Sequence, residues 1–157
     1  AAMGKRYVLY VTVSTGIGTG LVFNGEIFHG ANDPEGGHIR ICSEGKDRML
    51  EEVVSGPALK RRFGQYGYEV TDPDIWDAYA VDLATGIRNL IITISPEIVV
   101  IGGGVGVHFE QFERPLLKHL NAIKDTYPYP PIVPARYMET APAHGALILA
   151  AGLHRTK

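Results

Sequence analysis

The fold of this chain is decided by the stretch Tyr7-Val8-Leu9-Tyr10-Val11-Thr12-Val13-Ser14-Thr15-Gly16-Ile17-Gly18-Thr19-Gly20-Leu21-Val22-Phe23-Asn24-Gly25-Glu26-Ile27-Phe28. Its alternating glycines follow a β-rich run, as they do in dinucleotide-binding loops. Such a loop must open a helix whose N-terminus faces the pyrophosphate. A second apolar run follows here instead, and Asn-Gly between two apolar runs is the strongest short signal for a β-hairpin. The glycines therefore join two antiparallel strands.

The turn between these strands has the composition of an anion-binding site. Its backbone N–H groups, together with the hydroxyls of Ser14 and Thr15, can form a nest for a phosphate. Glycine lets the backbone close on such a ligand because it has no Cβ atom. The same pattern also fits a tight strand connection without a ligand, and the turn by itself favours neither interpretation.

A second glycine loop follows a different kind of strand. Residues 96–101 form a short apolar, β-branched run that is typical of a buried parallel strand, and Gly102-Gly103-Gly104 comes directly after it. Apolar residues then recur at helical spacing, at Phe109, Phe112, Leu116, Leu117, Leu120 and Ile123. A strand, a glycine turn and a helix can seat a flat ring or a phosphate at the carboxyl end of a sheet. Many α/β proteins use such a turn for packing alone.

The rest of the pattern is that of an α/β domain. A helical region over about 48–66 is interrupted by Ser55-Gly56-Pro57, where the proline suits the first turn of a new helix. The longest helix covers about 73–93 along one apolar stripe, with Asp72 as its cap and Ser95-Pro96 as its stop. Residues 35–45 are expected to form a loop. The proline-rich residues 127–131 lead into a strand over 132–137, and a terminal helix covers 143–153.

Taken in order, these motifs resemble the ROK family of bacterial sugar kinases, glucokinases and related repressors. The matching segments are residues 15–20, the Asn24-Gly25 hairpin, Glu35-Gly36-Gly37-His38, Leu50-Glu51 ahead of Ser55-Gly56, residues 100–104 and Gly145-Ala146. The resemblance extends from about residue 8 to residue 153, and its specificity comes from order and spacing together. It implies an α/β fold: an actin-like ATPase (ribonuclease H-like) domain with a mixed sheet, an N-terminal antiparallel hairpin and flanking helices.

The resemblance also implies roles for individual residues. Ser14, Thr15, Gly16 and Gly18 would lie on the phosphates of ATP, with Mg²⁺ bridging them, and Gly102, Gly103 and Gly104 would lie beside the adenosine. Glu35, His38 and Glu51 would hydrogen-bond the hydroxyls of a hexose or related sugar. Charge-assisted bonds of this kind discriminate between epimers. Considered singly, the two carboxylates are more typical of surface charges and the histidine of a structural residue. The shared order favours the sugar site.

One departure from the family concerns metal. Many relatives build a zinc site from the histidine of this motif and three cysteines. Cys42 is the only cysteine of this chain, and one thiol with one imidazole cannot complete a tetrahedral zinc site. We therefore predict no structural zinc, which leaves His38 free for the sugar.

A second departure concerns the domains. Kinases of this superfamily have a first domain that carries an Asp-x-Gly-Gly-Thr loop and the Asp that serves as general base. Neither precedes the hairpin here, and Asn32-Asp33-Pro34 is typical of a turn. We expect residues 1–157 to be the C-terminal domain of a two-domain sugar kinase, with the N-terminal domain absent and no activity by itself. The alternative is the sugar-sensing domain of a ROK-type repressor, which has no need of the phosphate hairpin.

Composition narrows the class of protein further. A chain of 157 residues, 45% of them hydrophobic, predicts about one domain. The net charge of −2 argues against a nucleic-acid partner for this domain. A single cysteine permits no internal disulfide and suits a reducing cytoplasm, and no apolar run is long enough to span a membrane. The resemblance implies a homodimer.

Overall fold

The computed structural model describes residues 1–122, 127–137, 140, 143, 145–147 and 150–151. Within them the larger sheet has the strand order β3-β2-β1-β6-β7. Its strands are β1 (Tyr7–Val13), β2 (Ile17–Phe23), β3 (Glu26–Phe28), β6 (Ile98–Gly102) and β7 (Ile132–Pro134). The first three strands pair antiparallel, whereas β6 pairs parallel to β1 and β7 parallel to β6. This mixed sheet with its N-terminal hairpin confirms the fold expected from the sequence.

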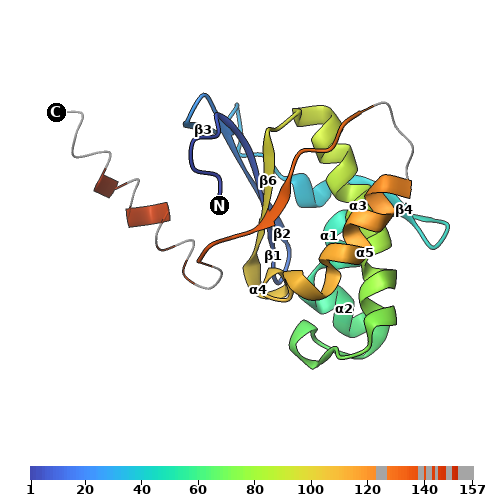
Figure 1. Cartoon of the computed structure of the whole chain (residues 1–157). Coiled ribbons are helices and arrows are strands. Elements are labelled where there is room, and N and C mark those ends of the chain that lie inside the picture. Colours follow the sequence, from blue (N-terminus) through green and yellow to red (C-terminus); the bar gives the residue numbers. More distant parts are fainter. Residues whose placement is uncertain (123–126, 138–139, 141–142, 144, 148–149, 152–157) are drawn as a thin grey trace.

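The described helices flank the sheet. They are α1 (Leu50–Val54), α2 (Gly56–Phe63), α3 (Pro73–Ile94), α4 (Gly103–Gly106) and α5 (Phe109–Ala122), with the 3₁₀ turns η1 (Gly36–His38) and η2 (Gly67–Glu69). Figure 1 shows α1, α2, α3 and α5 on the same side of the sheet. Among the residues that the structure describes, no helix is both long and apolar enough to cross a bilayer.

Local signals set the ends of the longest helix where the sequence predicts them. The Asp72 carboxylate accepts the backbone N–H of Asp74 at 2.9 Å, which caps α3. The helix ends at Ser95, whose φ of 52° lies in the left-handed region. The tight turn between β2 and β3 also forms as expected, because Asn24 and Gly25 both adopt positive φ angles of 54° and 86°.

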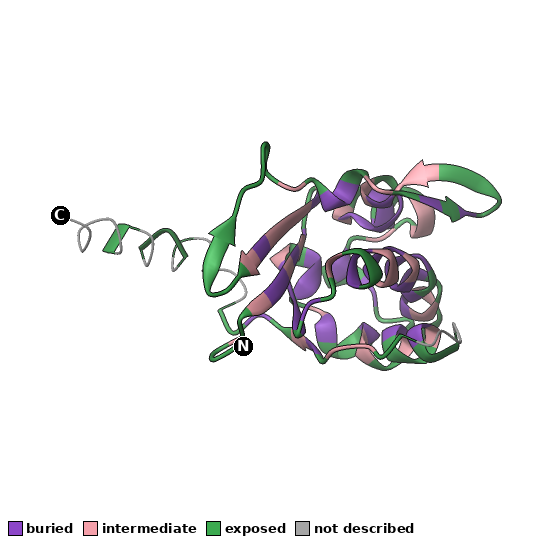
Figure 2. Cartoon of the chain, turned by 90° about the horizontal axis from the view of Figure 1, so that it is seen from above, coloured by how far each residue is buried: buried purple, intermediate pink, exposed green. Residues whose placement is uncertain are grey.

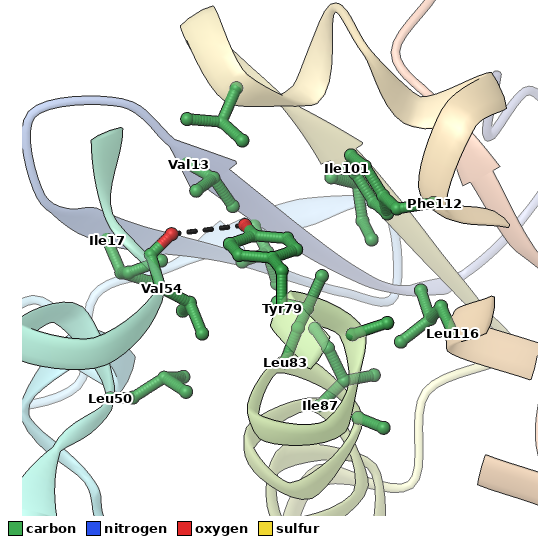
Figure 3. Close-up of a cluster of buried hydrophobic side chains, with 14 of the residues drawn as sticks. Val13, Ile17, Leu50, Val54, Tyr79, Leu83, Ile87, Ile101, Phe112 and Leu116 are labelled. Atoms are coloured by element: carbon green, nitrogen blue, oxygen red, sulfur yellow. Dashed lines mark hydrogen bonds between the residues drawn. The ribbon is translucent and has the colours of Figure 1, made fainter. Parts of the chain in front are cut away.

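The main core lies between the sheet and the helical layer. Leu9, Val11, Val99 and Ile101, on one face of β1 and β6, are wholly buried with side chains from α3 and α5. Figure 2 shows the buried positions concentrated between these two layers, and Figure 3 shows the side chains that meet there. This burial of apolar area supplies the main driving force for docking the helices on the sheet.

Polar contacts within this core hold α1 and α2 on α3. The Tyr79 hydroxyl of α3 donates to the Val54 carbonyl at 3.0 Å (Figure 3). Burial raises the pKa of Tyr79 far above its usual range, so this phenol remains a donor. The Arg62 guanidinium of α2 lies 2.8 Å from the Asp82 carboxylate, and both side chains are largely buried. The end of α1 and the helix α2 are therefore fixed relative to α3.

Three details differ from the sequence-based expectation. The region expected as a loop after Glu35 contains η1 and an antiparallel hairpin, β4 (Arg40–Ser43) and β5 (Lys46–Met49), which projects from the helical layer (Figure 1). The first helix begins at Leu50, because residues 46–49 pair in that hairpin. The strand expected over 132–137 ends at Pro134, since its partner β6 turns away at Gly102. The terminal helix expected over 143–153 lies partly outside the described residues.

Candidate functional site

The turn between β1 and β2 presents free hydrogen-bond donors. The Ser14 N–H closes the turn by donating to the Gly16 carbonyl at 2.9 Å. The N–H groups of Thr15 and Gly16 have no acceptor among the described residues, and the side chains of Ser14 and Thr15 are exposed. Gly18 lies beyond the turn, in β2 opposite Thr12. Adjacent free N–H groups and hydroxyls form a site suited to an anion.

Two distant segments hold this turn in place. The Ser14 carbonyl accepts the N–H of Gly56, at the start of α2, at 2.7 Å. The Ile17 N–H donates to Oε2 of Glu51, in the first turn of α1, at 3.3 Å. The turn is therefore preorganised, because the two helices that brace it are themselves fixed to α3.

The second glycine loop lies directly against the first. A Cβ atom added at Gly103 would lie 2.4 Å from the Val13 carbonyl oxygen, and the φ of Gly103 is +87°. A Cβ atom at Gly104 would lie 3.8 Å from Oγ of Ser14. Glycine is required at Gly103 both by this close approach and by the left-handed backbone. Gly102 comes 88 positions after Ser14 in the sequence, and yet the two glycine loops form one surface.

A cleft of about 370 Å³ opens beside this surface. It is lined by Ser14, Thr15, Gly56, Pro57, Tyr66, Gly67, Tyr68, Gly104 and Val105. The sequence predicted the serine, the threonine and the glycine of the second loop as site residues. It missed Tyr66, Gly67 and Tyr68, which form one wall of the cleft. The local signal for this wall was a pair of aromatic residues on either side of a glycine, in a segment between two helices.

The three residues expected to bind a sugar lie near the same turn. Nε2 of His38 is 3.6 Å from Oε1 of Glu51, and their side chains are 56% and 32% exposed. The exposed Glu35 precedes η1, and its carbonyl accepts the His38 N–H at 3.0 Å. The structure thus brings His38 and Glu51 together. It gives the Glu35 carboxylate no hydrogen bond within the described residues.

Close packing against β2 positions the segment from Glu35 to His38. The Thr19 hydroxyl donates to the Pro34 carbonyl at 2.8 Å and accepts the Gly36 N–H at 2.9 Å, which holds η1 against β2. A Cβ atom at Gly37 would lie 2.3 Å from the Ile17 carbonyl oxygen. The two glycines between Glu35 and His38 therefore let the segment approach the backbone of β2.

Leu50, the residue before Glu51, anchors α1 on α3. Leu50 is wholly buried, and a Cβ atom at Gly86 of α3 would lie 2.4 Å from its Cδ1 atom. Because successive side chains of a helix point in different directions, burying Leu50 leaves Glu51 directed toward the turn. The Glu51 carboxylate therefore contacts the Ile17 N–H at the turn and also the imidazole of His38, which is expected to bind the sugar.

The chain is similar in sequence to proteins of a known family. A family model described as ROK family matches residues 1–152. The chain belongs to the ROK family. It is 35% identical over 115 residues to a fructokinase of Lactococcus lactis subsp. cremoris, covering 65% of this chain and 39% of that protein. The chain spans from 38% to 58% of the length of eight curated relatives that it matches.

Solved structures of ROK proteins share the fold. The ROK hexokinase of Thermus thermophilus matches with a TM-score of 0.76 and 29% identity, over 90% of this chain and 55% of that one. A ROK glucokinase of Streptomyces griseus, in complex with glucose and AMPPNP, matches with a TM-score of 0.82 and 22% identity, over 95% and 62%. This ROK chain therefore has the mixed α/β architecture of actin-like ATPase sugar kinases.

A solved regulator of the ROK family shares this fold. A ROK family transcriptional regulator, a homolog of E. coli MLC, matches with a TM-score of 0.70 and 19% identity, over 87% of this chain and 43% of that one. The fold by itself therefore does not separate a kinase from a regulator.

A structural zinc site would need several ligand side chains close together. Cys42 lies exposed on β4. Within the described part of the chain, no group of three His, Cys, Asp or Glu side chains is placed to hold a metal ion. That this ROK chain holds no structural zinc stays a prediction, which elemental analysis of the purified protein tests.

Proposed function

We propose that this chain is the nucleotide- and sugar-binding C-terminal domain of an ATP-dependent hexose kinase, which transfers a phosphoryl group to a sugar hydroxyl. The observation that carries the proposal is the position of Glu51. Its carboxylate contacts both the Ile17 N–H of the phosphate turn and the imidazole of His38. A phosphoryl donor and a sugar must lie side by side for transfer, and this residue joins the two candidate subsites.

The nucleotide would lie across the two glycine loops. Its phosphates would take the N–H groups of Thr15 and Gly16 and the hydroxyls of Ser14 and Thr15, with Gly18 flanking them, while the adenosine would lie beside residues 102–104. Mg²⁺ would be held mainly by phosphate oxygens, as is usual for this ion. The AMPPNP-bound glucokinase relative supports a nucleoside triphosphate as donor.

The sugar would lie against Glu35, His38 and Glu51. Carboxylates accept hydrogen bonds from vicinal hydroxyls, and an imidazole can donate or accept as its tautomer requires. The half-exposed side chains of His38 and Glu51 leave polar atoms available for such bonds. Relatives named fructokinase and glucokinase support a hexose as the substrate class.

Catalysis would need a general base from outside residues 1–157. Asp33 is a poor substitute, because its carboxylate is exposed and bonds Nδ1 of His29 at 2.6 Å. We therefore propose that the 157-residue chain binds ligands but does not transfer phosphate. We further propose that it functions in the cytoplasm, as the single cysteine suggests.

The alternative function is sugar sensing in a ROK-type transcriptional repressor. A sensor has no need of free donors for a phosphate, so the N–H groups of Thr15 and Gly16, which have no acceptor in the described part of the chain, favour the kinase. The coding sequence upstream of the hairpin distinguishes the two functions. A kinase requires an Asp-x-Gly-Gly-Thr loop there, and a repressor a helix-turn-helix.

Nucleotide binding to the purified chain tests the donor site. We expect isothermal titration calorimetry to detect the Mg²⁺ complex of AMPPNP, and Thr15→Val to weaken its binding by about 1.5–3 kcal/mol, the scale of a hydrogen bond to a charged group. Thr85→Val is the matched control, because the Thr85 hydroxyl bonds the Val81 carbonyl on the surface of α3. Equal affinity in all three proteins would contradict the phosphate assignment.

Sugar kinetics test the acceptor site. In the complete kinase that also carries the general base, we expect Glu35→Gln to lower kcat/KM for the sugar by a factor that corresponds to about 1.5–3 kcal/mol, because it removes a charged hydrogen-bond acceptor. The KM for ATP should change little. Unchanged sugar kinetics in this variant would remove Glu35 from the site.

A further inference from the structure

The cleft beside the phosphate turn is poor in side chains that could recognise a base by hydrogen bonding. Of its lining residues, only Ser14, Thr15 and the two tyrosines carry a polar side-chain atom. Ser14 and Thr15 lie at the turn, where the phosphates would bind. In the described lining there is no amide, carboxylate or cationic side chain.

Several backbone groups of the cleft wall are also occupied. The Gly56 N–H donates to Ser14, and Pro57 has no N–H group. The carbonyls of Tyr66 and Gly67 accept the N–H groups of residues 69 and 70, at 2.8 and 3.3 Å. These atoms are therefore poorly available to the hydrogen-bonding edge of a nucleobase.

The wall instead offers an aromatic face. The rings of Tyr66 and Tyr68 stack with centroids 5.7 Å apart and an interplanar angle of 9°. Nζ of Lys60 lies 4.8 Å from the Tyr66 ring centroid. Tyr68 is 73% exposed, and its ring has no second ring or cation contact within the described residues. One face of a braced aromatic pair is thus open.

The loop that carries this pair is held in position before any ligand arrives. The Glu69 carboxylate accepts the Tyr66 N–H at 2.7 Å and lies 3.4 Å from Nζ of Lys60. The hydrogen bond from Tyr66 lowers the pKa of Glu69, so this carboxylate is ionised at neutral pH. A ring held in this way loses little conformational freedom when a base stacks on it.

We propose that this cleft takes the base of the phosphoryl donor by stacking on Tyr68 without reading its hydrogen-bonding edge. The domain then binds purine and pyrimidine nucleoside triphosphates alike. Stacking is tolerant because every base has a π face, whereas strong selection requires buried polar groups that the wrong base leaves unpaired. The inference rests on the proposed function, since the adjoining turn must hold the phosphates.

Calorimetric titration of the purified chain with the Mg²⁺ complexes of ATP, GTP and CTP tests the inference. We expect the three dissociation constants to agree within about fivefold, since stacking strength alone separates the bases. A preference for ATP of more than about thirtyfold would overturn base tolerance and leave the proposed function standing. If neither the nucleotides nor inorganic tripolyphosphate bound, the proposed function itself would fail.

A variant series tests the role of the ring. We expect Tyr68→Ala to weaken all three nucleotides by about tenfold and to leave tripolyphosphate binding unchanged, while Tyr68→Phe keeps full affinity. Tyr127→Ala, at an exposed tyrosine outside the cleft, is the matched control. Unaltered affinity in Tyr68→Ala, or a loss confined to ATP, would overturn the inference.

The single tryptophan provides a second readout for the same titrations. A Cβ atom at Gly67 of the cleft wall would lie 3.8 Å from Cη2 of Trp76. We expect each nucleotide to alter the Trp76 emission, and tripolyphosphate to leave it unchanged because that ligand does not reach the wall. Emission that responds to ATP alone would count against base tolerance.

Discussion

At the scale of single residues, Gly37 makes a close approach that no other residue type permits. An added Cβ atom would lie 2.3 Å from the Ile17 carbonyl oxygen, which belongs to β2 and cannot rotate away. We expect Gly37→Ala to lower the free energy of unfolding by about 1–3 kcal/mol, the usual cost of overpacking, as measured by urea denaturation. Gly20→Ala in β2 is the control, because its Cβ atom would meet Tyr10 at an ordinary 3.8 Å. Equal destabilisation of both variants would contradict this assignment.

Glu97 gives the stability of the fold a dependence on pH. Its carboxylate accepts the N–H groups of Tyr7 and Arg6 at 3.0 and 2.7 Å, and these bonds lower the pKa of Glu97. A lowered pKa means that the contribution is fully present above the pKa of the unfolded chain and is lost as pH falls through the folded value. We expect acid to lower the urea midpoint less in Glu97→Gln than in the unaltered chain. Parallel curves would show that these hydrogen bonds do not favour the ionised carboxylate.

At the scale of elements, the position of α2 on α3 depends on a buried ion pair. Arg62 lies 2.8 Å from Asp82, and its Nη1 donates to the Val53 carbonyl at 2.9 Å. We expect Asp82→Ala to lower the free energy of unfolding by about 3 kcal/mol, because it leaves a largely buried guanidinium without its main partner. Urea denaturation measures the loss.

A double variant separates the charge effect from packing. Replacing both partners, as Arg62→Met with Asp82→Leu, should recover most of the stability that Asp82→Ala loses, since no buried charge is then left unpaired. A double variant as unstable as the single one would mean that the shape of these side chains, and not their charge, holds α2 on α3.

At the scale of the whole molecule, we expect no sugar-dependent ATP turnover from the 157-residue chain. The proposed site orients a donor and an acceptor, and it assigns Glu35, His38 and Glu51 to binding of the sugar hydroxyls. The resemblance to sugar kinases places the general base, which removes the proton of the attacking hydroxyl, outside residues 1–157. A coupled assay for ADP with a panel of hexoses measures this. Turnover above background that Asp33→Asn abolished would instead assign the general base to this chain.

We also expect the chain to form a homodimer. Phe23, Ile27 and Phe28 expose 36%, 45% and 45% of their surfaces at the β2–β3 edge of the sheet (Figure 1). Exposed apolar groups on edge strands tend to bind a partner. The resemblance to the ROK family also implies a homodimer. Light scattering at micromolar concentration measures the mass. A folded monomer under these conditions would contradict the expectation.

Local chemistry explains which elements the sequence predicted and which it missed. Asn24-Gly25, the Asp72 cap and the apolar run of β6 act over a few residues, so their turn, helix start and strand appear as expected. The β4–β5 hairpin was missed because its strands have four residues each and half of these residues are charged. Its turn, Glu44-Gly45, has φ angles of 52° and 73°. The glycine at the second position was the available signal.

By itself, the sequence predicted the β1–β2–β3 segment, the long helix α3, the strand β6 and both glycine loops, and the family resemblance supplied the sugar candidates. Only the tertiary structure decided that Glu51 contacts Ile17, 34 residues away, and that Tyr66 and Tyr68 form the wall of the cleft. The contact of Glu51 exists because burial of Leu50 against α3 places the first turn of α1 beside the β1–β2 turn. Such docking depends on the summed burial of apolar area across the whole core, which no short stretch of sequence specifies.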